Sequence, residues 1–251
     1  MRRLFLRTSA LLLIATSVTN LHAAEAQIAV AANFAEPIKA IATVLQKTTG
    51  HTLKVTLGAT GKLYAQIVNG APFDVLLAAD TKTPERLEKE GMAQPGSRFT
   101  YATGKLVLWS ADAKRVDAKG EVLKSANLGK VAYAAPKVAP YGAAAVETME
   151  KLGLTAALTP KLVQGESISQ AFSFAYTANA DVGFIAMSQV LEGGKLRSGS
   201  MWVVPQALYS PIQQDAVVLK TAASNEAAQA LVKLLKSPNI KDLIRSYGYD
   251  I

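Results

Sequence analysis

The stretch QIAVAANFAEPIKAIATVLQKTTGHTLKVTL, residues 27–57, decides the fold class. Its first five residues form a short apolar run that is typical of a buried strand, and residues 53–57 predict a second strand. Between them, apolar residues recur at helical spacing from Ile38 to Leu45. A strand, helix and strand in succession predict an α/β fold with largely parallel strands.

The same alternation continues along the chain on both sides of a charged, loop-like stretch at residues 112–120. Further strands are predicted at residues 74–78, 105–109, 130–134, 161–163, 181–185 and 216–219. Further helices are predicted at residues 85–90, 143–152, 225–235 and 238–247, together with one ending near residue 70 and one beginning at residue 168. We therefore expect two lobes, lobe I from residues 27–107 and 208–251 and lobe II from residues 108–207. Each should be a mixed, mainly parallel sheet flanked by helices, with the ligand in the cleft between the lobes.

The first 26 residues have the layout of a cleaved secretory signal. Arg2, Arg3 and Arg7 precede an apolar run over residues 9–18, which is too short to span a membrane, and small residues follow at 23, 24 and 26. Cleavage is expected after residue 26, with residue 23 as the alternative. A buried helix of the folded protein would not explain this placement of charge, so we expect export to the periplasm.

Composition excludes several kinds of site. The chain has no cysteine and two histidines, of which His22 lies in the signal segment, so sites with several His or Cys ligands are excluded. Lys and Arg number 27 against 19 Asp and Glu. This excess suits an anionic ligand, but it also fits a basic exported protein with scattered lysines. No dense basic cluster with aromatics is present, so nucleic acid is not an expected partner.

An exported hydrolase is the alternative from a different functional class. A Ser-His-Asp triad would have to use His51, which lies in a turn between a helix and a strand. Carboxylate pairs are not evident, because Asp74, Asp80 and Asp181 follow or precede strands, where capping of turns is their expected role. We therefore expect a binding protein and not an enzyme.

Four strand-to-helix turns are candidates for holding an anion. Free backbone N–H groups and the positive end of the helix dipole favour negative charge at such turns. Asn33 with Glu36, and Ser167 with Gln170, also have the spacing of capping boxes, which is the alternative interpretation. The four turns are residues 31–33, 58–61, 140–142 and 166–168. Two in each lobe predict a shared cleft lined by hydrogen-bond donors.

The turn from Gly58 to Leu63 does not fit a phosphate-binding loop of nucleotide-binding proteins. The position five before Gly61 is Thr56 and not glycine, and Lys62 is followed by Leu63 and not by serine or threonine. The segment is better interpreted as a simple anion-binding turn.

At these segments the sequence resembles the periplasmic molybdate-binding proteins of ABC importers. The resemblance implies a two-lobed periplasmic binding protein of type II that captures molybdate, and tungstate as well, and delivers it to a membrane permease. It implies a monomer with no cofactor, the oxyanion being the ligand. The matching segments are Val30–Phe34, Gly70–Val75, Ala78–Asp80, Pro140–Gly142, Asp181–Ile185, Ser237–Pro238 and Ser246–Tyr249.

The resemblance also implies roles for particular residues in contact with the oxyanion. Asn33 and Thr60 match positions that bind through serine hydroxyls in many members, and Tyr141 and Ile168 match positions that bind through backbone N–H groups. The Tyr141 hydroxyl is a further candidate donor. Ala186 falls where many members have a tyrosine, so one donor is missing. The expected site residues are Ala32, Asn33, Thr60, Tyr141, Ile168 and Ala186.

Burying an anion without a countercharge requires several well-aimed hydrogen bonds, because an unpaired buried charge is very costly. Neutral N–H and O–H donors can supply them at about 1.5–3 kcal/mol each. Sulfate or phosphate remain alternative ligands, since cavity size decides among oxyanions. An organic solute would require more apolar and aromatic walls.

Overall fold

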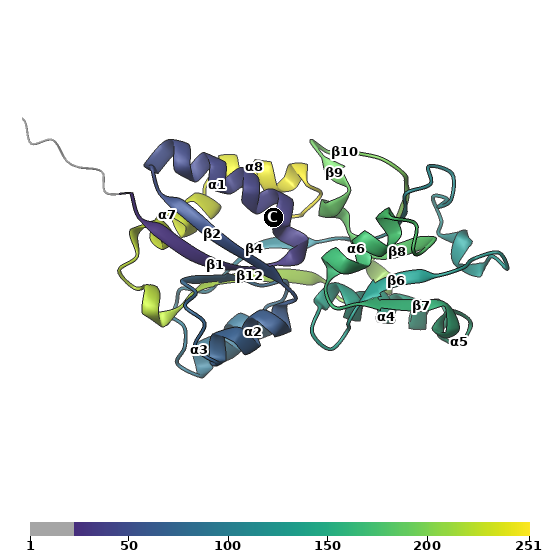
Figure 1. Cartoon of the computed structure of the whole chain (residues 1–251), viewed down its shortest axis with the longest axis horizontal. Helices are drawn as coiled ribbons and strands as arrows, with labels where there is room; N and C mark the ends of the chain where they lie inside the picture. The colour runs from purple at the N-terminus through teal and green to yellow at the C-terminus, as the bar shows by residue number, and fades with distance from the viewer. Residues whose placement is uncertain (1–22) are drawn as a thin grey trace, which may run out of the picture.

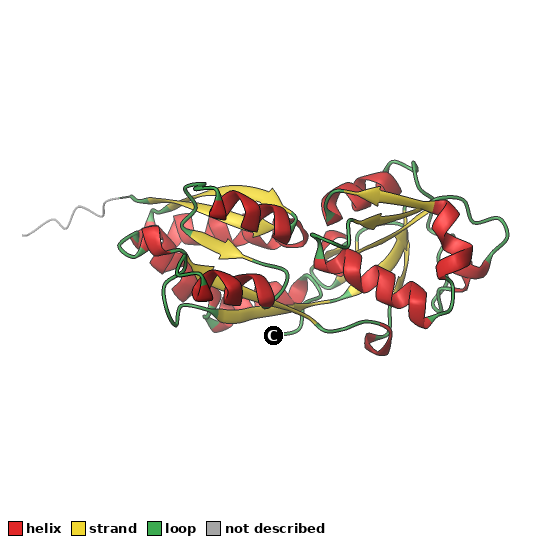
Figure 2. Ribbon diagram, turned by 90° about the horizontal axis from the view of Figure 1, so that it is seen from below, coloured by secondary structure: helices red, strands yellow, loops and turns green. Residues whose placement is uncertain are grey.

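The computed structural model describes residues 23–251, which fold into two lobes lying side by side (Figures 1 and 2). Each lobe is a five-stranded mixed sheet with helices on both faces, so the predicted two-lobed α/β architecture is confirmed. Of the predicted signal segment, residues 1–22 lie outside the described residues. No helix within residues 23–251 is both long and apolar enough to cross a membrane.

Lobe I contains both ends of the described chain. Its sheet has the order β2-β1-β3-β12-β4; β1 is parallel to β2 and β3, whereas β12 is antiparallel to β3 and β4. The strands are β1 (Glu25–Ala31), β2 (Thr52–Gly58), β3 (Val75–Leu77), β4 (Phe99–Gly104) and β12 (Ile212–Val218). The helices are α1 (Ala35–Thr49), α2 (Thr60–Val68), α3 (Lys82–Lys89), α7 (Glu226–Leu235) and α8 (Pro238–Ser246).

Successive side chains of a strand point to opposite faces of the sheet, so the apolar residues of lobe I form two core layers, one on each face. Ile28 and Val30 of β1 pack in one layer with α1, α7 and α8. Ala29 of β1 faces the other layer, which contains Leu63 of α2 and Leu87 of α3. The predicted amphipathic face of α1 is buried, and α1 ends at Gly50, whose positive φ of 76° gives the left-handed cap that glycine adopts without strain.

Lobe II has the equivalent strand order, β7-β6-β8-β5-β11. Here β6 is parallel to β7 and β8, while β5 is antiparallel to β8 and β11. Parallel and antiparallel pairings are equally frequent in each lobe, so the sheets are mixed as predicted but not mainly parallel. The strands are β5 (Leu106–Ser110), β6 (Val131–Ala134), β7 (Leu162–Gly165), β8 (Val182–Ala186) and β11 (Ser200–Val203), with a short hairpin of β9 (Leu191–Glu192) and β10 (Lys195–Leu196). The helices are α4 (Pro140–Lys151), α5 (Thr155–Leu158) and α6 (Ile168–Tyr176).

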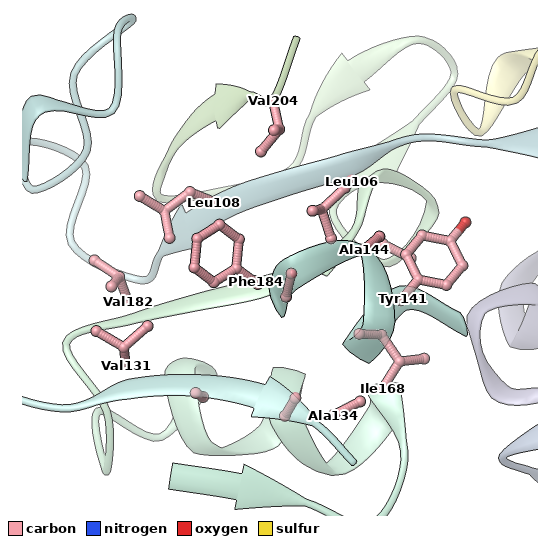
Figure 3. Packing of buried hydrophobic residues seen from close by; sticks show 14 of the residues in the cluster. Leu106, Leu108, Val131, Ala134, Tyr141, Ala144, Ile168, Val182, Phe184 and Val204 are labelled. Carbon is pink, nitrogen blue, oxygen red and sulfur yellow. The ribbon is translucent and has the colours of Figure 1, made fainter. Parts of the chain in front are cut away.

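The core of lobe II reaches the edge that faces lobe I. Leu106, Leu108 and Phe184 pack with Tyr141 and Ile168, the residues at the starts of α4 and α6 (Figure 3). The packing therefore fixes the amino ends of these two helices relative to the sheet.

Two segments join the lobes. The chain leaves lobe I at Lys105, between β4 and β5, and returns through residues 204–211, between β11 and β12. The boundary predicted at residues 107 and 108 falls within β5, because the apolar run from Leu106 belongs wholly to the sheet of lobe II. Strands β4 and β11 escaped prediction; both lie at a sheet edge and carry polar residues among their apolar ones.

The start of β1 bears on where the expected signal segment would end. Glu25 and Ala26 belong to β1, and Ala26 is fully buried opposite Leu53. Cleavage after Ala26 would remove both strand residues, whereas the alternative after Ala23 leaves β1 whole.

Candidate functional site

A small pocket lies where the carboxyl ends of the strands of both lobes face each other. It is far smaller than the pockets of about 300–1,000 Å³ that bury drug-sized ligands. Its walls come from β1 and the short 3-10 turn η1 (Ala32–Phe34), from the β2–α2 turn, and from the starts of α4 and α6. The lining residues are Ala31, Ala32, Asn33, Gly58, Ala59, Thr60, Ala79, Ala139, Pro140, Tyr141 and Ile168. Five of the six expected site residues are therefore brought together.

Thr60 presents a hydroxyl whose orientation is set by its neighbour. It is the first residue of α2, is buried, and accepts a hydrogen bond from the Ala79 backbone N–H at 3.0 Å. Since that bond occupies the oxygen as an acceptor, the hydroxyl hydrogen is free to donate. Among the described residues it has no acceptor, and neither has the backbone N–H of Thr60.

Ile168 begins α6 and offers its backbone N–H. Ser167 is the N-cap residue, and its hydroxyl accepts a hydrogen bond from the Gln170 backbone N–H. The Gln170 side chain in turn accepts one from the Glu166 backbone N–H and not from that of Ser167, so the predicted cap at Ser167 is present but the return bond of a capping box is not. The Ile168 N–H, lying inside these caps, has no acceptor within residues 23–251.

Tyr141 lines the pocket and offers its backbone N–H. Its N–H, in the first turn of α4, has no acceptor in the described part of the chain. The ring points away from Ile168 (Figure 3), and the hydroxyl accepts a hydrogen bond from Gln214 Nε2 at 3.2 Å. Burial raises the pKa of this hydroxyl well above its usual value, so it stays neutral.

Asn33 departs from the sequence prediction. Its side chain caps no helix, and Glu36 instead pairs with Lys39. Both hydrogens of Asn33 Nδ2 are used within the protein, one by Gln214 Oε1 and one by the Tyr249 hydroxyl, each at 2.9 Å. The amide nitrogen is therefore unable to donate to a ligand, and the Asn33 backbone N–H, which has no acceptor among the described residues, takes its place.

Ala186 lies outside the pocket walls. It is fully buried at the end of β8, opposite Leu106, and its N–H donates to Gln189 Oε1. A methyl group in this position is too short to reach the pocket, so the inclusion of Ala186 among the expected contacts is corrected.

Contacts across the pocket hold the lobes together. The Gly61 backbone N–H of lobe I donates to the Val138 carbonyl of lobe II at 3.0 Å. The side chains of Lys62 and Glu166 form an ion pair between the lobes and are both well exposed. The structure thus shows the two lobes in contact beside the pocket.

His51 lies at the other end of lobe I. It precedes β2 at the amino ends of the parallel strands, where its Nδ1 accepts a hydrogen bond from the Ala24 N–H at 3.1 Å. The pocket faces the carboxyl ends of the same strands. His51 therefore has no part in this site, which removes the residue on which a hydrolase would depend.

Gly142 provides a test of how closely α4 must approach the sheet. A Cβ atom at this position would lie 2.2 Å from the Ala134 carbonyl oxygen. Gly142→Ala is expected to push α4 from β6, lower the unfolding free energy by about 1–3 kcal/mol and displace the Tyr141 N–H. Urea unfolding and calorimetric titration of the candidate ligand measure both effects; an unchanged midpoint would show that α4 has room to move.

Comparisons with known proteins point in one direction. The profile of the family described as bacterial extracellular solute-binding protein matches residues 26–250. The chain is 56% identical over 229 residues to the molybdate-binding protein ModA of Azotobacter vinelandii, covering 91% of each chain. It is 57% identical to that of Rhodobacter capsulatus, covering 90% of this chain and 88% of the relative. Among solved structures, the periplasmic molybdate-binding protein of Azotobacter vinelandii superposes with a TM-score of 0.87 at 40% identity, covering 90% of this chain and 99% of that one.

Proposed function

The chain belongs to the family of bacterial extracellular solute-binding proteins, and we propose that it captures molybdate between its lobes and delivers it to an ABC importer. The resemblance to periplasmic molybdate-binding proteins noted in the sequence is confirmed by relatives of that name. The ligand would be held by the Thr60 hydroxyl and by backbone N–H groups at Asn33, Thr60, Tyr141 and Ile168.

The observation that carries this proposal is the neutrality of the pocket. Its lining side chains include neither a carboxylate nor a Lys or Arg. Three of the unpaired donors come from lobe I and two from lobe II, so a bound anion favours closure. Such donors stabilise negative charge through aligned dipoles without a countercharge.

Neutral walls also discriminate among anions. Phosphate near neutral pH keeps a proton, whose O–H group would require an acceptor when buried, and the lining side chains offer no carboxylate for it. An organic solute is disfavoured because pockets for such ligands measure about 300–1,000 Å³. Sulfate has the same charge and shape as molybdate, so it is the remaining alternative.

The proposal extends to export and delivery. A signal segment removed after Ala23 would release a periplasmic monomer whose β1 is whole. Closure around the anion would form one continuous surface of both lobes, which the membrane permease can recognise. Tungstate should bind in the same way because it has the same charge and tetrahedral shape, and no cofactor is needed.

Thermal unfolding with a panel of anions tests the proposal. Molybdate or tungstate at about 100 times the dissociation constant should add about 2.7 kcal/mol to stability. For a protein of this size that corresponds to a rise of roughly 5–10 °C in Tm. Sulfate and phosphate at the same concentration serve as controls. Equal or greater stabilisation by sulfate or phosphate would contradict the assignment to molybdate.

A further inference from the structure

A buried polar network lies directly behind the pocket and crosses between the lobes. Ser188, in the 3-10 turn η4 (Met187–Gln189) that follows β8 of lobe II, donates to the Asn33 carbonyl of lobe I at 2.7 Å. The Tyr249 hydroxyl lies within hydrogen-bond distance of both groups, 2.9 Å from the Asn33 oxygen and 3.0 Å from Ser188 Oγ. All three residues are at most 3% exposed.

The same turn also contacts the donor on the lobe II side of the pocket. Gln189 donates from Nε2 to the Ile168 carbonyl at 3.2 Å, while its Oε1 accepts from the Ala186 N–H. Consecutive residues of η4 thus bind the carbonyls of Asn33 and Ile168, whose N–H groups face the pocket from opposite lobes. Of these two carbonyl contacts of η4, only that of Ser188 crosses between the lobes, so opening the cleft by separating η4 from η1 would break it.

Hydrogen bonds within lobe I fix Asn33, whose carbonyl accepts the hydrogen bond from Ser188. Asn33 Nδ2 is fixed by Gln214 and Tyr249, and Gln214 Oε1 also accepts from the Tyr101 hydroxyl at 3.0 Å. These partners all belong to lobe I, so their bonds do not depend on closure. They hold the peptide of Asn33 in one orientation, with its carbonyl directed at Ser188.

From this geometry we propose that Ser188 and Gln189 are positioning residues that couple the anion-binding N–H groups of the two lobes. The inference rests on the proposed function, because it specifies how the same pocket is held closed. Neither residue touches the anion: Ser188 holds the lobe I turn against lobe II, and Gln189 holds η4 against the start of α6.

The test compares Ser188→Ala with Ser110→Ala in the purified full-length mature protein. Ser110 is a matched control, since it is also 3% exposed and donates to a backbone carbonyl, that of Asp181 at 2.6 Å, but wholly within lobe II. Both variants should lose similar stability. Ser188→Ala should bind molybdate roughly tenfold more weakly, through faster dissociation, and Ser110→Ala should bind like the wild type. Calorimetry gives the affinity and stopped-flow fluorescence the dissociation rate.

Gln189→Ala is a second variant in case Ser188→Ala does not fold, because Gln189 is half-buried. Its dissociation rate should also rise severalfold. Wild-type affinity and dissociation rate in the folded variants would overturn the positioning role while leaving the proposed function intact. Absence of molybdate binding by the wild-type protein would overturn both.

Discussion

Replacing Ile168 by proline is expected to weaken molybdate binding by roughly 10- to 100-fold while leaving the fold intact. Ile168 is the first residue of α6, where proline is tolerated and its missing N–H is not needed by the helix. Ser167 before it has φ −147° and ψ 168°, an extended conformation compatible with a following proline. The variant therefore loses one donor to the buried anion.

Ile168→Ala separates the backbone from the side chain. It keeps the N–H but removes a buried apolar group, so it should cost about 2–5 kcal/mol of stability and bind molybdate nearly as the wild type does. Calorimetric titration of molybdate into both folded variants decides whether the backbone or the side chain of residue 168 matters for binding. If the proline variant binds as tightly as the alanine one, the anion is not held by the backbone at this turn.

Thr60→Val should affect both binding and stability. Valine keeps the shape but loses the hydroxyl, so molybdate binding should weaken by roughly 10- to 100-fold. It also leaves the buried Ala79 N–H without its acceptor, which should lower the unfolding free energy by about 1–3 kcal/mol. Titration and urea unfolding measure the two effects separately.

Thr60→Ser is the control for this prediction, because it retains a hydroxyl that can accept from Ala79 and donate to the anion. It should bind within about twofold of the wild type, since no charge-assisted hydrogen bond is lost. A valine variant with normal affinity but reduced stability would assign the Thr60 hydroxyl to the Ala79 contact alone.

The sequence was informative where structure depends on neighbouring residues. Local spacing predicts the helix of residues 35–49, the parallel strands and the cap at Ser167. It also predicts that Thr60, Tyr141 and Ile168 converge, because they lie at the starts of helices that follow β2, β6 and β7. Edge strands β4 and β11 carry a weaker periodic signal. The exact boundary between the lobes depends on which of the two sheets the apolar segment from Leu106 joins. The local sequence pattern does not specify this.

The role of the Asn33 side chain could not be predicted from the sequence, for a different reason. Its side-chain partners Gln214 and Tyr249 lie 181 and 216 residues further along the chain. Spacing within the turn suggested a cap, and resemblance suggested a ligand contact, but only the assembled lobe shows that the amide hydrogens are already taken. Ser188 and Gln189 were missed likewise, because their partners are backbone carbonyls that leave no trace in the sequence.

The position of β12 between β3 and β4 has a consequence for how the molecule folds. The sheet of lobe I cannot form the β3–β12 and β12–β4 pairings until residues 212–218 have been added, whereas lobe II is continuous from β5 to β11. Chain segments that are close in sequence associate faster than distant ones. A chain emerging from its amino end would therefore complete lobe II first and carry unpaired edges of β3 and β4 meanwhile. Refolding should show lobe II as the early unit and the closing of lobe I as the slow step.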